Sequence, residues 1–126
     1  MAIVGTGIDI TEVPRIAAAI ERHGERFLQR IFTAAEIRYC ESKKNKVERY
    51  AARFAAKEAA MKAIGTGWRQ GVAWKEIEVG HERGGRPTVI FTGKVKQHAE
   101  RLGAKRASLS LTHTEQIAMA QVILED

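Results

Sequence analysis

The chain has 126 residues and a net charge of +6, with a sequence pI near 9.8. A chain of this length buries one core but is too short for two, so we expect residues 1–126 to form a single domain. The only cysteine, Cys40, excludes an intrachain disulfide framework and a clustered-cysteine zinc site. No apolar run is long enough to span a membrane, and the N-terminal residues read as a strand rather than a signal peptide, so we expect a cytoplasmic protein.

The positive charge favours an anionic partner, which could be a nucleic acid, a phosphorylated ligand, an acidic protein or a membrane surface. Stacking on single-stranded nucleic acid is disfavoured because only 6% of the residues are aromatic.

The first ten residues alternate between two kinds of side chain. Apolar Val4, Ile8 and Ile10 occupy one set of positions, and Gly5, Gly7 and Asp9 occupy the other. This period of two predicts a strand. Asp is disfavoured inside strands, and glycines on its own face leave room for a ligand or for another backbone. The alternative is that Asp9 caps the following helix.

A basic amphipathic helical segment follows. Thr11 is expected to cap it, and Pro14 is tolerated in its first turn. The apolar stripe is interrupted at Gly24 and consists of Ile16, Ile20, Phe27 and Ile31. Three arginines lie off this stripe, namely Arg15, Arg22 and Arg26. They form either a solvated face or a docking surface for an acidic partner.

A long alanine-rich helix is predicted from about Lys46 to Ile64. A capping box at Thr33 to Glu36 opens a short helix before it, and Gly65-Thr66-Gly67 ends the long one. The apolar series Val47, Ala51, Phe54, Met61 and Gly65 predicts one face packed against a core, and Glu58 falls within this series. A carboxylate there needs a partner or a proton. Lys62 lies four residues later, and the alternative is an ordinary surface ion pair between the two.

The second half of the chain reads mainly as strands. They are expected at 73–80, 88–91, 108–113 and 117–124, with a turn at 84–87 and a helix over 92–102 stopped by Gly103. The last two strands form an antiparallel hairpin. These elements predict an α+β fold with a mainly antiparallel sheet, one long helix and several shorter helices. His113 closes a strand at a turn, where a histidine is more often structural than functional.

The two acids are the candidate site. Asp9 on a strand and Glu58 on a helix can jointly hold a hard divalent cation. Mg²⁺ takes one or two protein carboxylates, and substrate phosphates and waters complete its octahedron. A small basic nucleic-acid-binding domain is the rival interpretation. It explains the charge but not two acids at glycine-lined or apolar positions.

Three segments of the chain together resemble a known family. They run from Gly5 to Val13, from Arg53 to Gly67 and from Ser108 to Thr114, and they contain an early Gly-x-Asp and a later Lys-Glu-Ala-x-x-Lys. This combination is similar to the holo-[acyl-carrier-protein] synthases, the short bacterial type of 4′-phosphopantetheinyl transferase. The match covers essentially the whole chain in length and order. Thr112 departs from it, because the family often has serine there.

The resemblance implies a reaction and a set of residues for it. The 4′-phosphopantetheine of coenzyme A would move to a serine of an acidic acyl carrier protein, releasing adenosine 3′,5′-bisphosphate, with neither nucleic acid nor membrane as a partner. The implied Mg²⁺ ligands are Asp9 and Glu58, and the general base is left open between Glu58, Asp9 and water. Lys62 would contact the phosphates or protonate the leaving group. The implied coenzyme A contacts are Arg53, Lys62, Gly65, Gly67 and His113, and the implied docking residues are Arg15, Arg22 and Arg26. The family also implies a homotrimer with sites between subunits.

Overall fold

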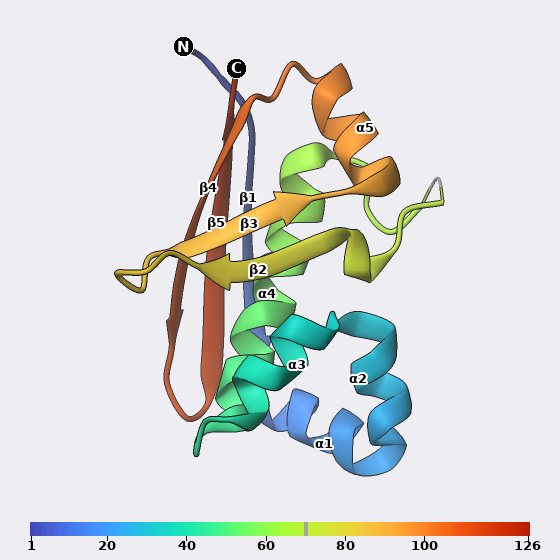
Figure 1. Cartoon of the computed structure of the whole chain (residues 1–126), viewed down its shortest axis with the longest axis vertical. Helices are drawn as coiled ribbons and strands as arrows, with labels where there is room; N and C mark the ends of the chain where they lie inside the picture. The colour runs from blue at the N-terminus through green and yellow to red at the C-terminus, as the bar shows by residue number, and fades with distance from the viewer. Residues whose placement is uncertain (70) are drawn as a thin grey trace.

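The computed structural model describes residues 1–69 and 71–126. In chain order its elements are β1 (Ile3–Glu12), α1 (Val13–His23), α2 (Glu25–Ile31), α3 (Ala34–Glu41), α4 (Lys46–Ile64), the 3₁₀ turn η1 (Trp74–Glu76), β2 (Ile77–His81), β3 (Pro87–Phe91), α5 (Gly93–Arg101), β4 (Arg106–His113) and β5 (Ile117–Glu125). Figure 1 shows α1, α2 and α3 gathered at one end of α4 and α5 at the other. Within the described residues, no helix combines the length and the apolar character that crossing a membrane requires.

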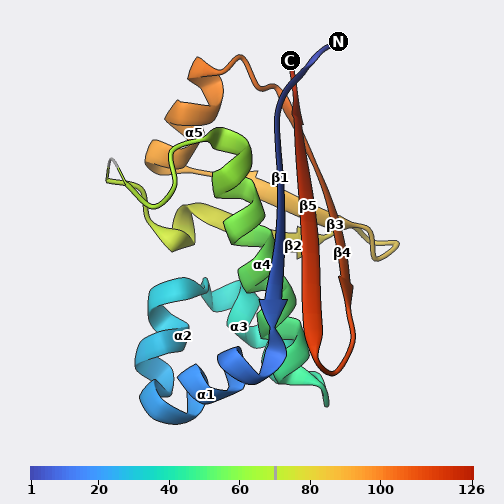
Figure 2. The same ribbon diagram turned by 180° about the vertical axis from the view of Figure 1, so that it is seen from behind.

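The strands form two antiparallel sheets. β5 lies between β1 and β4 in the larger sheet, and β2 pairs with β3 in the smaller one. Helix α4 covers the inner face of the larger sheet and also contacts β2 (Figures 1 and 2). The predicted α+β class is confirmed, but the strands are divided between two sheets rather than joined in one.

Helix α4 is buried on almost every side, which corrects the prediction of a single apolar face. From Tyr50 to Ile64, every residue is buried except Glu58 and Lys62. The helix packs against two hydrophobic clusters at once, so between Tyr50 and Ile64 only this one stripe is left to solvent. Glu58 therefore does not lie on the apolar seam as predicted. It lies on the one open stripe, four residues from Lys62.

Strand β1 and helix α4 touch through their backbones. A Cβ atom added to Gly5 would collide with the carbonyl oxygen of Ala63, and one added to Gly7 would collide with that of Ala59. The glycines are thus required by the approach of another backbone, which is one of the two reasons expected from the sequence. The space beside Asp9 that the glycines leave is occupied by the helix.

A buried ion pair fixes α4 against α3 and the smaller sheet. Lys57 Nζ lies 2.8 Å from Glu36 Oε1, and both side chains are fully buried. Lys57 also donates to the carbonyls of Trp74 and Ile77, and Glu36 accepts from the backbone N–H of Val79. Burial lowers the pKa of Lys57, and the Glu36 carboxylate opposes this change. Because all these groups are paired, removal of one partner is expected to cost about 3–5 kcal/mol.

Most local predictions are confirmed. The bounds of α4 agree with the sequence, Thr33 and Glu36 form the expected capping box, and the terminal hairpin is present. Two are wrong. Thr11 is the next-to-last residue of β1 rather than a helix cap, and the backbone N–H of Val13 is satisfied by the carbonyl of Gln116 at 2.9 Å.

The second error concerns the strand expected over 73–80. Its first residues form η1 instead, because the Glu76 carboxylate accepts from the backbone N–H of Ala73 at 3.1 Å and closes a turn. The strand begins only at Ile77.

Cys40 is buried in the hydrophobic cluster that the helices α1, α2 and α3 form with α4. Burial raises the pKa of its thiol to about 12 and keeps it protonated.

The contact between β1 and α4 leads to a stability prediction. Gly7→Ala should lower the free energy of unfolding by at least about 2 kcal/mol, because the added methyl group meets backbone that cannot rotate away. Gly84→Ala is the matched control, since a Cβ there meets nothing within 4 Å. Urea denaturation of both variants measures the difference, and equal midpoints would contradict the proposed reason for Gly7.

Candidate functional site

The first cluster forms where β1 lies against α4, and it contains Asp9 and Lys62. Lys62 Nζ lies 3.2 Å from Asp9 Oδ1 and donates to the carbonyl of Ile8 at 3.0 Å. The other oxygen of Asp9, Oδ2, accepts from the Thr11 hydroxyl at 2.9 Å. The alternatives raised from the sequence are therefore not realised: Asp9 caps no helix, and Lys62 pairs with Asp9 rather than with Glu58.

Glu58 lies beside this pair with no ion-pair partner among the described residues. Burial raises the pKa of Glu58 above its ordinary value, and the negative charge of Asp9 contributes to the rise. The indole of Trp68 and the charges of Lys62 and Arg15 act in the opposite direction. The Trp68 Nε1–H lies near enough to favour the ionised carboxylate but does not meet hydrogen-bond geometry, and it is buried without a hydrogen-bond partner among the described residues. The structure thus brings together the predicted residues Asp9, Glu58 and Lys62.

The composition of this cluster suits a hard cation. Two carboxylates supply oxygen ligands, and the Lys62 ammonium already occupies a cation position on Asp9. Across the part of the chain that the structure describes, no three or more His, Cys, Asp or Glu side chains are grouped to hold a metal. Mg²⁺ does not require such a group, because water and substrate phosphates normally complete its coordination.

The end of α4 contains the predicted glycines Gly65 and Gly67. Both have positive φ angles, of 86° and 62°. Gly65 is the left-handed residue that ends the helix, and its N–H donates to the carbonyl of Met61. Their backbone conformation therefore accounts for both glycines, and the predicted contact with a ligand stays a prediction.

A second cluster contains the other predicted residues, Arg53 and His113. They line one cavity of about 510 Å³. The Arg53 guanidinium lies 4.1 Å from the centre of the Tyr39 ring, and its Nε is buried without a hydrogen-bond partner among the described residues. His113 Nδ1 lies 3.0 Å from Glu48 Oε1. Further cations at this cavity are Lys43, Arg49 and Arg83, so the cavity is suited to an anion.

The two clusters lie on different sides of α4. Asp9 is on β1, and its row of the sheet passes through Ala120 to Leu111 on β4, which lines the second cavity. Helix α4 covers the inner face between these two edges (Figure 2). None of Asp9, Glu58 and Lys62 lines the cavity of Arg53 and His113.

The three docking arginines are exposed, but they do not behave alike. The Arg15 guanidinium lies 6.0 Å from the centre of the Phe54 ring and is close enough to Glu58 to lower its pKa. Arg26 lines a cavity of about 410 Å³ that also includes Phe54 and Trp74. Arg22 lies in the last turn of α1 and lines none of the cavities described here.

Several residues of the two clusters were not found from the sequence. Thr11 shares the strand face of Asp9, so the period of two could have identified it. Trp68 follows the end of α4, and no spacing pattern connects it with Glu58. Tyr39 and Glu48 reach the second cavity or its histidine from α3 and the start of α4, and only the tertiary fold shows this.

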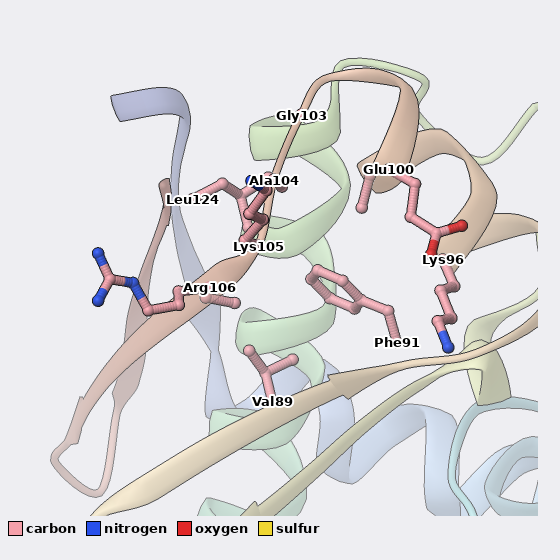
Figure 3. Close-up of a pocket in the computed structure, with 11 residues that line it drawn as sticks. Val89, Phe91, Lys96, Glu100, Gly103, Ala104, Lys105, Arg106 and Leu124 are labelled. Atoms are coloured by element: carbon pink, nitrogen blue, oxygen red, sulfur yellow. The ribbon is translucent and has the colours of Figure 1, made fainter. Parts of the chain in front are cut away.

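A further cavity of about 550 Å³ contains no predicted site residue. Figure 3 shows Val89 and Phe91 of β3 pointing into it, with Lys96 and Glu100 of α5 at its rim. Its lining is mostly apolar, and it lacks both carboxylates of the first cluster.

Comparisons with known proteins identify the family of the chain. Residues 5–121 match the family model of the 4′-phosphopantetheinyl transferase superfamily. The chain is 69% identical to a holo-[acyl-carrier-protein] synthase of Koribacter versatilis, with 98% of this chain and 99% of the relative covered. It is 58% identical to that of Solibacter usitatus, over 98% of this chain and 99% of the relative.

Two crystal structures share the fold. The holo-[acyl-carrier-protein] synthase of Neisseria meningitidis aligns with a TM-score of 0.90 at 35% identity, covering 99% of this chain and 100% of that one. The Helicobacter pylori enzyme in complex with coenzyme A aligns with a TM-score of 0.84 at 27% identity, covering 95% and 99%. The resemblance found in the sequence is thereby confirmed. The chain belongs to the 4′-phosphopantetheinyl transferase superfamily and is one of its holo-[acyl-carrier-protein] synthase enzymes.

Proposed function

We propose that this enzyme transfers the 4′-phosphopantetheine group of coenzyme A to a serine hydroxyl of an apo acyl carrier protein and releases adenosine 3′,5′-bisphosphate. The observation that carries the proposal is the meeting of Asp9, Glu58 and Lys62 at the contact of β1 and α4. A relative of known structure binds coenzyme A, which supports the choice of donor.

Asp9 and Glu58 are proposed to hold Mg²⁺, which would supply positive charge to the pyrophosphate as the leaving phosphate develops charge. Asp9 presents its carboxylate from the strand, with Thr11 holding one oxygen. Glu58 presents a half-buried carboxylate from the helix, and its raised pKa suits a group that accepts the serine proton directly or through water. Lys62 supplies a second cation for the phosphates.

The cavity of Arg53 and His113 is proposed to take the 3′-phosphate end of coenzyme A. The Nε–H of Arg53 is a buried donor that lacks an acceptor among the described residues, and a phosphate oxygen would satisfy it. Tyr39 supports the guanidinium from one side. Lys43 and Arg49 add charge that attracts the same anion.

The separation of the two clusters supports the proposed homotrimer with sites between subunits. One coenzyme A molecule would use the carboxylates of one subunit and the basic cavity of its neighbour. The outward face of β1 exposes Ile8 and Ile10, which are 50% and 59% exposed, and burial against another copy would remove this apolar surface from water.

The arginines of α1 and α2 are proposed to dock the acidic carrier protein. Arg22 and Arg26 supply charge complementarity, which mainly sets orientation and association rate. Arg15 lies between this face and Glu58, so its charge acts on both docking and the site.

The central test is a transfer assay on the carboxylates. An apo acyl carrier protein incubated with coenzyme A, Mg²⁺ and the enzyme should gain the mass of one phosphopantetheinyl group. Asp9→Asn and Glu58→Gln should each slow this reaction by about 100-fold or more, because each removes a charged ligand of one ion. Glu100→Gln on exposed α5 is the matched control and should react like wild type. Near-wild-type turnover of either site variant at saturating Mg²⁺ would refute the shared metal.

The raised pKa of Glu58 predicts how stability depends on pH. In buffer with a chelator, Glu58→Gln should be more stable than wild type at pH 7, because ionising a half-buried carboxylate costs solvation. Solvent screening limits the gain to less than about 1 kcal/mol. The gain should shrink as pH falls through the raised pKa and vanish below the ordinary value of 4.5, where both side chains are neutral. Thermal unfolding across pH measures this, and an advantage that stays constant with pH would contradict it.

Charge reversal of Arg22 and Arg26 separates docking from chemistry. The double variant Arg22→Glu with Arg26→Glu should raise the KM for the carrier protein by about tenfold or more and leave that for coenzyme A unchanged. Salt should slow wild type more than the variant, because screening acts over about 8 Å at physiological ionic strength. Arg101→Glu, an exposed position on α5, is the control. If wild type and the double variant gave identical curves of transfer rate against carrier-protein concentration, Arg22 and Arg26 would be only a solvated face.

A further inference from the structure

The two oxygens of Asp9 are held in different ways. Oδ2 accepts from Thr11, whose side chain is buried and cannot move far. Oδ1 contacts the ammonium of Lys62, whose side chain is 56% exposed. One oxygen of the carboxylate is therefore fixed from inside the protein, and the other is paired with a group that solvent can reach.

The Lys62 ammonium occupies the place of a cation. It lies 3.2 Å from Asp9 Oδ1 and 3.0 Å from the carbonyl oxygen of Ile8, so two oxygens of β1 converge on it. The Asp9 side chain is only 15% exposed, but the lysine end of the pair lies in solvent, so solvent screening keeps the cost of replacing Lys62 to the fold small.

We propose that Lys62 is an internal counter-cation of Asp9, which an incoming divalent metal displaces, and that Thr11 is the residue that keeps Asp9 oriented during the exchange. The inference rests on the proposed function, because it takes Asp9 as a metal ligand. It goes beyond that function by assigning Lys62 a second role before the substrate binds, and by assigning Thr11 a role as a positioning residue.

The exchange links metal binding to the later role of Lys62. While Lys62 neutralises Asp9, its ammonium is not available to a phosphate. With a divalent cation held by Asp9, the long exposed side chain of Lys62 would be free to contact an anionic ligand beside it. The same lysine thus opposes metal binding in the free enzyme and assists the phosphate chemistry afterwards.

Thr11 favours metal binding by Asp9, whereas Lys62 opposes it. A hydroxyl that donates to the far oxygen of a metal-binding carboxylate holds the near oxygen in place, and loss of such a partner typically weakens metal binding by about tenfold or more. Val has nearly the same shape as Thr but lacks the hydroxyl, so Thr11→Val removes the hydrogen-bond donor and keeps the side-chain volume.

Mn²⁺ binding to the full chain without coenzyme A tests the proposal, with the free ion counted by electron paramagnetic resonance. Lys62→Ala should bind Mn²⁺ about twofold to fivefold more tightly than wild type, because a competing cation is gone. Lys105→Ala, which removes the same charge from an exposed position in the loop before β4, should bind as wild type does. Thr11→Val should bind about tenfold more weakly, and Thr11→Ser should restore affinity.

Asp9→Ala separates failure of this inference from failure of the proposed function. If Asp9→Ala binds Mn²⁺ as well as wild type, the metal is not at Asp9, and both the metal proposal and this inference fall. If binding depends on Asp9 but Lys62→Ala binds no more tightly than wild type, the counter-cation role is overturned and the metal site stands. Weaker binding by both Thr11→Val and Thr11→Ser would make Thr11 merely structural and overturn its positioning role. Lower transfer turnover of Lys62→Ala together with tighter Mn²⁺ binding would support both roles of the lysine.

Discussion

The contact of β1 with α4 is the constraint on which the rest of the structure depends. Gly5 and Gly7 lack the Cβ atoms that would collide with the helix carbonyls, so strand and helix backbones meet directly. This closeness places Asp9, two residues after Gly7, against the side of α4 that contains Glu58 and Lys62. A wider spacing between strand and helix would separate the two carboxylates and leave each without the other. Gly5 and Gly7 influence the positions of these carboxylates only because they set the distance between the backbones of β1 and α4.

The rotation of α4 about its axis is the second constraint. The buried pair of Lys57 and Glu36 fixes the side of the helix next to Glu58, and alanines fill most of the remaining surface. Only the stripe of Glu58 and Lys62 is then left open between Tyr50 and Ile64. Small residues around the helix permit close packing on several sides, which explains why a helix so rich in alanine can occupy the centre of the fold. Arg53 belongs to the same helix but lines the cavity on its opposite side.

Local signals in the sequence predicted local structure well. The bounds of α4, the capping box at Thr33 and the terminal hairpin depend on neighbouring residues, and all three are confirmed. The pairing of charges was not predictable in this way. Spacing along the helix favours an ion pair between Lys62 and Glu58. The fold instead brings Asp9 Oδ1 of the strand to 3.2 Å from Lys62 Nζ, and the lysine pairs with Asp9. The effect of Arg15 on Glu58, and the contribution of Tyr39 to the second cavity, likewise arise only when separate helices meet.

Both tryptophans of the chain belong to one stack beside the first cluster. The rings of Trp68 and Trp74 lie 3.6 Å apart, and Trp68 is the indole that adjoins Glu58. All indole emission of the protein is therefore expected from a single place, and we expect the coupled transitions of the stacked rings to contribute to its near-ultraviolet dichroism. Loss of the carboxylate's charge, or a movement of the segment that follows α4, changes the surroundings of the only two fluorophores of this type. The wild-type chain thus contains its own optical reporter, with no label attached.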